Sequence, residues 1–340
     1  MTTKILVTGG AGFIGMHLIK SLLEHNFHVC GIDNFTDITY ESSLKYDRLC
    51  SLGINKDEFL ESKVYESDNF CFYRMDICDK DAVFNLISKG NFSYVVNLAA
   101  LPGVRLSTLK SEEYIKTNVN GFFNILEAIR VLKHEERPFL LFASSSSVYG
   151  DCSIVPFKED ASDLHQVSVY AATKRMDEIL AYTYGSLHHL KSIGLRFFTV
   201  YGPWGRPDMA PFIFTKALLS GKEIRLFNHG DLQRDFTYID DIVSGIISII
   251  LQDDKQFSEN FDVYNIGCGH PVKLMDFVRI LEDVTGRKGK LIMERMQKGD
   301  VHQTYASTQK LEDDYGYIAK TPLKEGLAKF YSWYQHYYKV

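Results

Sequence analysis

The chain of 340 residues is 45% hydrophobic and 24% charged, so it can bury a large core in one or two domains. Its net charge of -5 and the lack of a basic run argue against a nucleic-acid partner. The sequence enters a strand pattern at once and never reaches the roughly 18 uninterrupted apolar residues of a membrane span, so we expect a cytoplasmic protein without a membrane partner. Its six scattered cysteines form no CxxC pair, which predicts neither disulfides nor a metal site.

The N-terminus carries a strand, a glycine turn and a helix in direct succession. An apolar run at Ile5–Val7 leads into TGGAGFIG, Thr8 to Gly15, and then into a helical pattern. In such a unit Gly9 allows the tight turn, Gly12 lets the backbone approach a pyrophosphate, and Gly15 lets the helix pack closely on the strand. The helix N-terminus then favours an anion. The segment therefore predicts a dinucleotide site, and a turn that binds nothing is the disfavoured alternative.

A second apolar run, His28 to Ile32, ends at Asp33. In the dinucleotide fingerprint an acid at this place binds the adenosine ribose. The carboxylate favours NAD, because it would repel the 2′-phosphate of NADP and neither Asn34 nor Phe35 supplies a compensating cation.

Further along the chain, short apolar runs alternate with helical patterns. This alternation predicts an α/β fold, a Rossmann-type doubly wound parallel sheet with a smaller, interleaved C-terminal substrate lobe. Residues 36–69 are too long for a simple loop and are expected to carry a helix at about 42–52, to which we assign no chemistry. A helix expected at 111–133 is apolar on two sides, which suggests a partner helix. The further strands are expected at Phe70–Met75, Tyr94–Leu98, Phe139–Ala143 and Ser192–Phe198.

Two polar patterns follow the predicted sheet strands. A hydroxyl cluster, Ser144 to Ser147, comes directly after a strand, and ligands of doubly wound sheets bind at the carboxyl ends of strands. Downstream, Tyr170 and Lys174 lie four residues apart and so share a helix face. A lysine charge beside a phenol lowers the phenol's pKa below its usual value of about 10. Together these side chains could exchange a proton with a substrate alcohol; a polar strand end and an ordinary surface pair are the alternatives.

The strings TGGAGFIG, ASSSSVYG and YAATK, in this order and spacing, resemble those of extended short-chain dehydrogenases/reductases, and specifically of nucleotide-sugar epimerases. Further segments resemble UDP-glucuronate 4-epimerases in particular: GVRLS (Gly103–Ser107), GLRFFTVYGPWGRPDMA (Gly194–Ala210), NHG (Asn228–Gly230), RDFTYIDDI (Arg234–Ile242) and KGDV (298–301). The resemblance implies an NAD-dependent enzyme that interconverts UDP-glucuronate and UDP-galacturonate through a 4-keto sugar. It also implies a homodimer built from a four-helix contact and a role in polysaccharide biosynthesis.

The same resemblance implies roles for individual residues. Ser145, Tyr170 and Lys174 would be catalytic. The implied NAD-binding residues are Gly9, Gly12, Phe13, Ile14, Gly15, Asp33, Asn34, Asp76, Ile77, Leu98, Ala99, Ala100, Asn118, Tyr170 and Lys174. The implied substrate-binding residues are Arg105, Ser146, Ser147, Thr199, Arg206, Asn228, Arg234 and Asp300. The NAD-binding domain would cover residues 1–198 and about 236–268, and the UDP-sugar lobe would cover 199–235 and 269–340.

One departure from the family's sequence pattern and three alternative functions remain open. Leu101–Ser107 differs from the family's usual QAGVRYS, since Pro102 stiffens the loop and Leu106 replaces a tyrosine, so either Arg105 or Arg206 could read the sugar carboxylate. The alternatives are a UDP-hexose 4-epimerase acting on glucose or a 2-acetamido sugar, a UDP-glucuronate decarboxylase, and a non-catalytic protein that senses dinucleotides. Decarboxylases place an acid within the stretch that matches Ser145–Ser147, where this chain has only hydroxyls.

Overall fold

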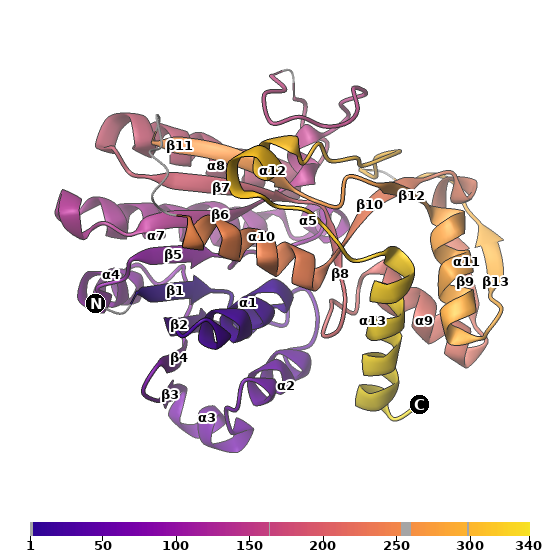
Figure 1. Cartoon of the computed structure of the whole chain (residues 1–340), viewed down its shortest axis with the longest axis horizontal. Coiled ribbons are helices and arrows are strands. Elements are labelled where there is room, and N and C mark those ends of the chain that lie inside the picture. Colours follow the sequence, from indigo (N-terminus) through magenta and orange to yellow (C-terminus); the bar gives the residue numbers. More distant parts are fainter. Residues whose placement is uncertain (1–2, 163, 253–259, 298) are drawn as a thin grey trace. The chain divides into compact units, whose positions relative to one another are not determined.

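The computed structural model describes residues 3–162, 164–252, 260–297 and 299–340 (Figure 1). Lys298 of the KGDV string lies outside this range. The chain divides into two compact units. The first comprises Met1–Gly150, His165–Arg196 and Ile250–Tyr264, and the second comprises Asp151–Leu164, Phe197–Ile249 and Asn265–Val340. The assignment of one domain to the cofactor and one to the sugar nucleotide stays a prediction.

An eight-stranded sheet forms the first unit, in the order β11-β7-β6-β5-β1-β2-β4-β3. Neighbours from β6 to β4 run parallel, whereas β3 lies antiparallel to β4. Because β2 and β5 flank β1 on opposite sides, the strand order reverses there, and such a switch point opens a crevice at the carboxyl ends of the strands. The strands are β1 (Lys4–Thr8), β2 (His28–Asp33), β3 (Val64–Glu66), β4 (Phe70–Arg74), β5 (Tyr94–Asn97), β6 (Phe139–Ser145), β7 (Ser192–Phe197) and β11 (Phe261–Ile266).

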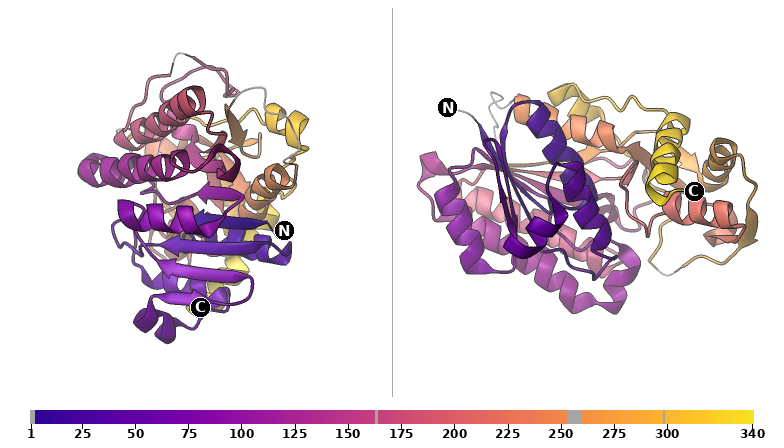
Figure 2. Two further views of the ribbon diagram at one scale, coloured as in Figure 1. Left: turned by 90° about the vertical axis from the view of Figure 1, so that its left-hand side faces the viewer. Right: turned by 90° about the horizontal axis from the view of Figure 1, so that it is seen from below.

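Helices cover both faces of this sheet (Figure 2), as its central strands, buried on both sides, require. On one face, Val95 and Leu140 of the sheet pack against Ile87 and Phe122 of the helices. The predicted strands and the doubly wound fold class are confirmed. The main helices of this unit are α1 (Phe13–Glu24), α4 (Lys80–Gly90), α7 (Gly121–Arg130) and α8 (Val169–His188).

The segment expected to form one helix at 111–133 is divided into three. It comprises α6 (Ser111–Tyr114), a π-helical segment η1 (Ile115–Asn120) and α7, which ends at Arg130. The predicted helix is confirmed over 111–130, but it ends three residues early and its middle turn is π-helical. The extra residue of a π-turn re-aims side chains, and Asn118 in this turn makes buried hydrogen bonds to two other segments.

The insertion between β2 and β4 forms two short helices. The predicted helix is confirmed as α2 (Ser43–Ser51), and α3 (Lys56–Ser62) and β3 follow it. Aromatic rings anchor the insertion to the sheet: Phe35 stacks on Tyr46 at 4.5 Å and lies 6.2 Å from Phe72 of β4. This packing brings α2 against the glycine turn.

Within its described residues, the second unit contains two small sheets and four longer helices. Strand β10 (Gln233–Tyr238) lies between β8 (Thr199–Tyr201) and β12 (Pro271–Lys273), while β9 (Glu223–Leu226) pairs with β13 (Lys290–Met293). The helices, α9 (Ala210–Ser220), α10 (Ile239–Leu251), α11 (Leu274–Thr285) and α13 (Leu323–Tyr338), are accompanied by the shorter α12 (Gln309–Tyr315).

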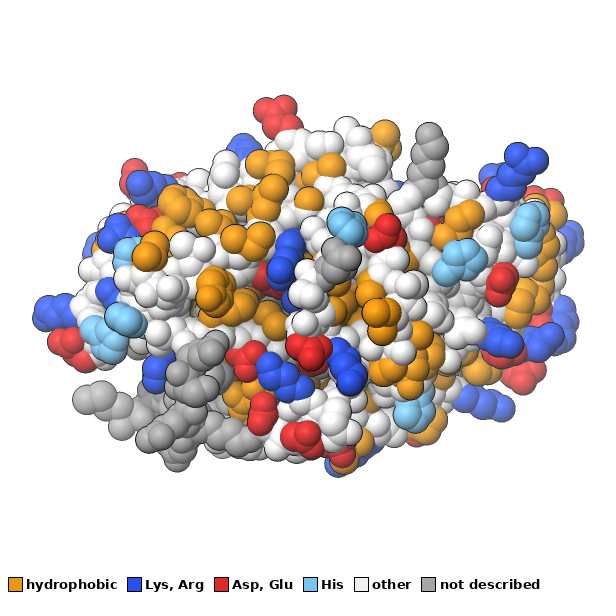
Figure 3. Space-filling view, turned by 90° about the horizontal axis from the view of Figure 1, so that it is seen from above, with side chains coloured by type: hydrophobic (Ala, Val, Ile, Leu, Met, Phe, Trp, Pro, Cys, Tyr) orange, Lys and Arg blue, Asp and Glu red, His pale blue; other side chains and the backbone are white. Residues whose placement is uncertain are grey.

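Several large hydrophobic side chains lie on the surface, and Figure 3 shows such side chains among charged ones on the face seen from above. Helix α8 exposes Met176, Ile179 and Tyr182 at 42%, 53% and 58%. In the described residues, no helix is both long and apolar enough to cross a membrane.

Candidate active site

The glycine turn between β1 and α1 has no space for a side chain at its glycine positions. A Cβ atom on Gly12 would lie 2.8 Å from the Gly9 carbonyl oxygen, and one on Gly15 would collide with the same oxygen. Gly9 has a φ of +67°, and its Cβ would lie 2.8 Å from the Ala99 amide nitrogen. The backbone N–H groups in the first turn of α1, which begins at Phe13, have no acceptor within the helix. This turn therefore fits a pyrophosphate held by backbone N–H groups.

Asp33 ends β2 and is only 7% exposed. Its Oδ2 accepts a hydrogen bond from the Ala11 amide at 3.2 Å, and its Oδ1 accepts one from the Phe35 amide at 2.8 Å. The carboxylate is thereby fixed beside the glycine turn, as a ribose-binding acid requires.

Two basic side chains of α2 reach the same turn, and the sequence analysis missed both. Lys45 Nζ lies 3.8 Å from Asp33 Oδ1 and donates to the Thr36 carbonyl at 2.9 Å. Arg48 is fully buried and donates to the Ala11 carbonyl at 3.1 Å and to the Tyr40 hydroxyl at 2.8 Å. The signal in the sequence was a lysine and an arginine three residues apart on a short helix, which is common on protein surfaces.

Residues predicted to meet the adenine and the cofactor's underside lie at the ends of neighbouring strands. Asn34 donates from Nδ2 to Asp76 Oδ2 at 3.0 Å, which joins the ends of β2 and β4. Burial acts to raise the pKa of Asp76, but the hydrogen bonds from Cys78 and Asn34 outweigh it and lower this pKa below its usual value. After β5, the Ala99 amide donates to Thr8 Oγ1 at 3.1 Å.

Asn118 lies deep in the first unit and links two parts of the site. Its Oδ1 accepts from the Leu101 amide at 2.7 Å, and its Nδ2 donates to the Leu101 carbonyl at 3.1 Å. The same Nδ2 donates to Thr173 Oγ1 at 3.0 Å, between Tyr170 and Lys174. The amide thus holds the segment after β5 against α8, and a direct contact with the cofactor stays a prediction.

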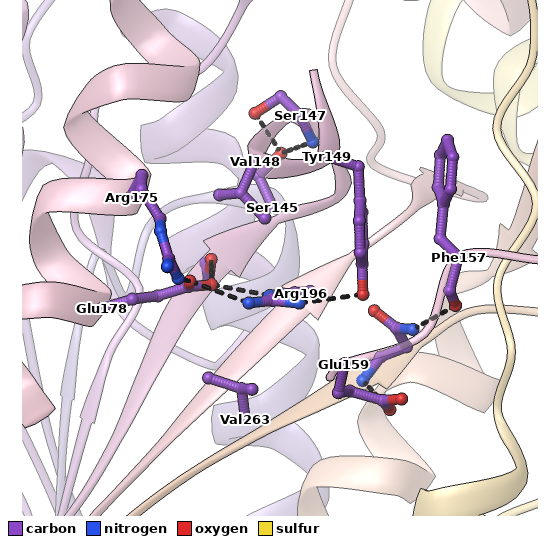
Figure 4. Close-up of polar contacts among 12 residues, drawn as sticks. Ser145, Ser147, Val148, Tyr149, Phe157, Glu159, Arg175, Glu178, Arg196 and Val263 are labelled. Carbon is purple, nitrogen blue, oxygen red and sulfur yellow. Dashed lines mark hydrogen bonds and ion pairs between the residues drawn. The ribbon is translucent and has the colours of Figure 1, made fainter. Parts of the chain in front are cut away.

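The hydroxyl cluster begins at the carboxyl end of β6 (Figure 4). Ser145 is 9% exposed, and its Oγ accepts hydrogen bonds from the amide and the hydroxyl of Ser147 at 3.2 and 2.9 Å. Ser146 begins the short helix η3 (Ser146–Tyr149). Ser144 is engaged elsewhere, because its hydroxyl donates to Glu178 at 2.6 Å.

Helix α8 carries Tyr170 in its first turn. Ser168 caps the helix by accepting from the Ala171 amide at 3.1 Å. The Tyr170 ring stands edge-on to that of Tyr114, with centroids 6.3 Å apart, and the Tyr114 hydroxyl donates to the Pro102 carbonyl at 2.7 Å. One turn later, Lys174 is 2% exposed. The phenol and the ammonium therefore start from one face of a helix that packs against β6 and η3.

A buried ion-pair network lies under the serine cluster (Figure 4). Arg196 of β7 donates from Nε and Nη2 to the two carboxylate oxygens of Glu178 at 2.8 and 3.0 Å. Burial acts to raise the pKa of Glu178, but Arg196 outweighs it, so this pKa lies below its usual value. Arg196 also donates to the Tyr149 hydroxyl at 3.0 Å. The network connects β7, α8 and η3, and the sequence analysis missed it because its members are far apart in the chain.

Arg105, in the first unit, is one of the two residues predicted to bind the sugar carboxylate. It follows Gly103, whose φ is +104°, on the short helix α5 (Val104–Leu109) that packs against α8. Its side chain is exposed.

The other predicted substrate residues lie in the second unit. Thr199 of β8 pairs in register with Phe236 of β10, the strand that carries Arg234, and Arg234 donates to the His302 carbonyl at 3.1 Å. Asn228 is in η4 (Phe227–Gly230), and the Asp300 amide donates to the Gln297 carbonyl at 3.3 Å.

Arg206 already faces a carboxylate of its own loop. Its Nε and Nη2 donate to the two oxygens of Asp208 at 3.1 and 2.6 Å. The fork that could bind a sugar carboxylate is therefore partly occupied by Asp208.

Asp235, beside Arg234, was not predicted. It is fully buried, and its two oxygens accept from the amides of Cys268, Gly269 and Ala306 at 2.8, 3.0 and 3.0 Å. Burial raises the pKa of this carboxyl despite these bonds. The aspartate ties β10 to two distant segments and so supports the position of Arg234.

Residues 5–267 match the model of the NAD dependent epimerase/dehydratase family. The chain is 42% identical over 349 residues to protein CapI of Staphylococcus aureus, with 99% of both proteins covered. It is 40% identical to UDP-glucuronate 4-epimerase 2 of Arabidopsis thaliana, over 99% of this chain and 76% of that protein. Among solved structures, UDP-glucuronic acid 4-epimerase from Bacillus cereus, in complex with UDP-glucuronic acid and NAD, gives a TM-score of 0.87 at 33% identity, with 99% of this chain and 100% of that one covered. The chain therefore belongs to the NAD dependent epimerase/dehydratase family.

Proposed function

We propose that this protein is an NAD-dependent 4-epimerase that interconverts UDP-glucuronate and UDP-galacturonate through a 4-keto intermediate. The observation that carries the proposal is the pairing of Tyr170 and Lys174 on one face of α8, which packs against the strand end that bears Ser145. Similarity over nearly the whole chain to proteins named for this reaction supports it.

The chain's own residues fit the cofactor. The backbone of the turn from Gly9 to Gly15 would hold the pyrophosphate, and Asp33 would accept from the adenosine ribose. Asp76 and Ile77 would border the adenine, with Leu98, Ala99 and Ala100 beneath the cofactor. When bound, NAD accepts a hydride and later returns it, so it is regenerated in each turnover.

The proton steps fall to the catalytic residues. Tyr170 would take the proton of the sugar O4 hydroxyl and later give it back, while Ser145 donates to the same oxygen. Lys174 would stabilise the phenolate by its charge. Between the two steps, the 4-keto sugar must turn its other face to the same groups. Arg234 and Asp300 would meanwhile hold the diphosphate and the uridine, and Asn228 and Thr199 would contact the rest of the substrate.

The carboxylate imposes a further demand, because the 4-keto uronate is a β-keto acid that readily loses carbon dioxide. A guanidinium binds a carboxylate through two parallel hydrogen bonds and so fixes its orientation. Arg105 would fill this role and restrain the group, with Ser146 and Ser147 beside the sugar.

The direct test is to incubate the purified protein with UDP-glucuronate and to separate the products. We expect UDP-galacturonate of unchanged mass. A UDP-pentose would instead indicate a decarboxylase, and turnover of UDP-glucose alone would indicate a hexose epimerase. If dinucleotide binds but no sugar nucleotide changes, the protein is a sensor.

Arg105→Ala tests the source of uronate specificity. Hydrogen bonds to charged groups contribute about 1.5–3 kcal/mol each, so we expect affinity for UDP-glucuronate to fall at least about 10-fold while affinity for UDP stays the same. Isothermal titration of both ligands measures this difference. The mutant should also release UDP-4-keto-pentose, which mass spectrometry detects.

Lys110→Ala is the matched control, because Lys110 is an exposed cation five residues further along the chain. If the affinities for UDP and UDP-glucuronate fall together in Arg105→Ala, or neither changes, Arg206 becomes the candidate reader.

We also propose that the protein is a homodimer. The exposed side chains Met176, Ile179 and Tyr182 lie at helical spacing on α8, and Phe123 of the neighbouring α7 is 42% exposed. Two such helices and their copies would bury this apolar surface in a four-helix contact. A cytoplasmic location and a role in polysaccharide biosynthesis stay predictions.

Multi-angle light scattering at micromolar concentration should give about twice the 38.9 kDa of the chain. Ile179→Lys should shift the protein toward a monomer, whereas Ile154→Lys, at an exposed site outside these helices, should not. A monomeric wild type would refute the dimer.

A further inference from the structure

A buried carboxylate that no step above uses lies next to Lys174. Asp177 is 1% exposed, and its Oδ2 is 3.1 Å from Lys174 Nζ. Its other oxygen, Oδ1, is buried and has no hydrogen-bond partner. Most buried polar atoms in folded proteins are hydrogen-bonded, so one without a partner requires an explanation.

The helix sets the order of the three groups. Tyr170, Lys174 and Asp177 are residues i, i+4 and i+7 of α8 and therefore follow one another along the same face. At 1.5 Å per residue, Asp177 starts about 10 Å along the axis from Tyr170, with Lys174 between them. Lys174 therefore lies between the phenol and the carboxylate in the order of residues along this face.

The charges that act on Asp177 come from α8 itself, namely Lys174, which favours its ionised form, and Glu178, which opposes it. Glu178 is in turn paired with Arg196 of β7 and with Arg175. The elements packed against α8 contribute charged side chains that are exposed or paired with one another: Arg105 of α5, Glu112 and Glu113 of α6, Lys116 of η1, and Glu127 with Arg130 of α7.

We propose that Asp177 is a positioning residue for the epimerase: it holds the Lys174 ammonium in place and, as a counter-charge, sets the pH at which Tyr170 gives up its proton. When Asp177 is ionised, its negative charge offsets the positive charge of Lys174 and weakens the stabilisation of the Tyr170 phenolate. When Asp177 is neutral, the lysine charge acts on the phenolate without this offset. The catalytic consequence rests on the proposed function, whereas the effect on the phenol can be measured without a sugar nucleotide.

The environment of Asp177 is consistent with a carboxyl group that changes its charge near neutral pH. Burial raises its pKa from the usual 3.8 to about 7, although Lys174 acts in the opposite direction. A raised pKa in the folded state means that the carboxyl contributes stability fully below pH 3.8 and that this contribution is lost as the pH rises through about 7.

The test compares the wild type with Asp177→Asn, which keeps the size and removes the charge. The ultraviolet absorbance of the Tyr170 phenolate is obtained as the difference between each protein and its own Tyr170→Phe derivative, without substrate. We expect the pH midpoint of phenolate formation to be lower in Asp177→Asn than in the wild type by about 0.3–1 pH unit. This is the range given by a unit charge about 10 Å away at effective dielectric constants between those of water and of a protein surface. Glu113→Gln, which removes an exposed charge on neighbouring α6, should leave the midpoint in place.

The acidic limb of the pH–rate profile with UDP-glucuronate should move by the same amount and in the same direction. Asp177→Asn removes one partner of a buried pair and should lower the free energy of unfolding, so the phenolate midpoint, which a purely structural carboxylate would leave unchanged, is the readout that distinguishes the two roles. Asp177→Ser removes the same charge and decides the matter if the asparagine variant does not fold. An unchanged phenolate midpoint in both variants overturns the proposal; a shifted midpoint without turnover of UDP-glucuronate overturns the proposed function and leaves the inference about Asp177 standing.

Discussion

Tyr170→Phe is expected to reduce kcat by about 100-fold or more, because it removes the group that exchanges a proton with the sugar hydroxyl and general acid–base catalysis typically contributes that much. The ring itself stays, and with it the edge-on contact to Tyr114. Binding of UDP-glucuronate, measured by calorimetry, should therefore persist while steady-state turnover nearly disappears.

Tyr182→Phe is the matched control, since Tyr182 lies on the same helix and is 58% exposed. It should retain wild-type kcat. If Tyr170→Phe binds the substrate and also turns over at the wild-type rate, Tyr170 is not the base, and Ser145 would have to be tested in its place.

Glu178→Ala is expected to lower the free energy of unfolding by about 3–5 kcal/mol, because removing one partner of a buried pair leaves the other charge without compensation. Glu178 and Arg196 are 1% and 2% exposed, and the carboxylate also accepts from Ser144. Urea unfolding followed by circular dichroism measures the change.

Two further variants show whether the loss comes from a stranded charge. The double variant Glu178→Leu with Arg196→Met replaces the pair with apolar side chains and should be more stable than Glu178→Ala alone. Glu325→Ala breaks an exposed pair with Lys329 and should change stability little. If Glu178→Ala unfolds like the wild type, the network does not support the fold around the serine cluster.

Local patterns explain why much of the site could be predicted from the sequence. The turn from Gly9 to Gly15 depends on residues that are close in the chain, and so does the pairing of Tyr170 with Lys174 on one helix face. The central strands of the large sheet are short apolar runs whose burial on both faces leaves few alternatives. In each of these cases the residues that decide the structure are within one helix, strand or turn.

The groups that escaped prediction make long-range contacts. Arg196 reaches Glu178 across 18 positions, and Arg48 reaches Ala11 across 37. Asn118 was implied as an NAD-binding residue, but its bridge between Leu101 and Thr173 was not predicted, because no periodicity in the sequence marks the π-turn that directs its side chain. Asp177 is close in sequence to Lys174, but only its complete burial distinguishes it from an ordinary charged neighbour on a helix.

The hydrogen bond from Arg48 to the Ala11 carbonyl limits how this fold can be rebuilt. The backbone of the glycine turn is hydrogen-bonded to a helix of the insertion that follows β2. The turn is therefore not structurally independent of that insertion. A chimera that exchanges this insertion for the shorter connection of another enzyme would leave that carbonyl without its arginine. Grafts between enzymes of this fold should therefore transfer the turn and α2 as one unit.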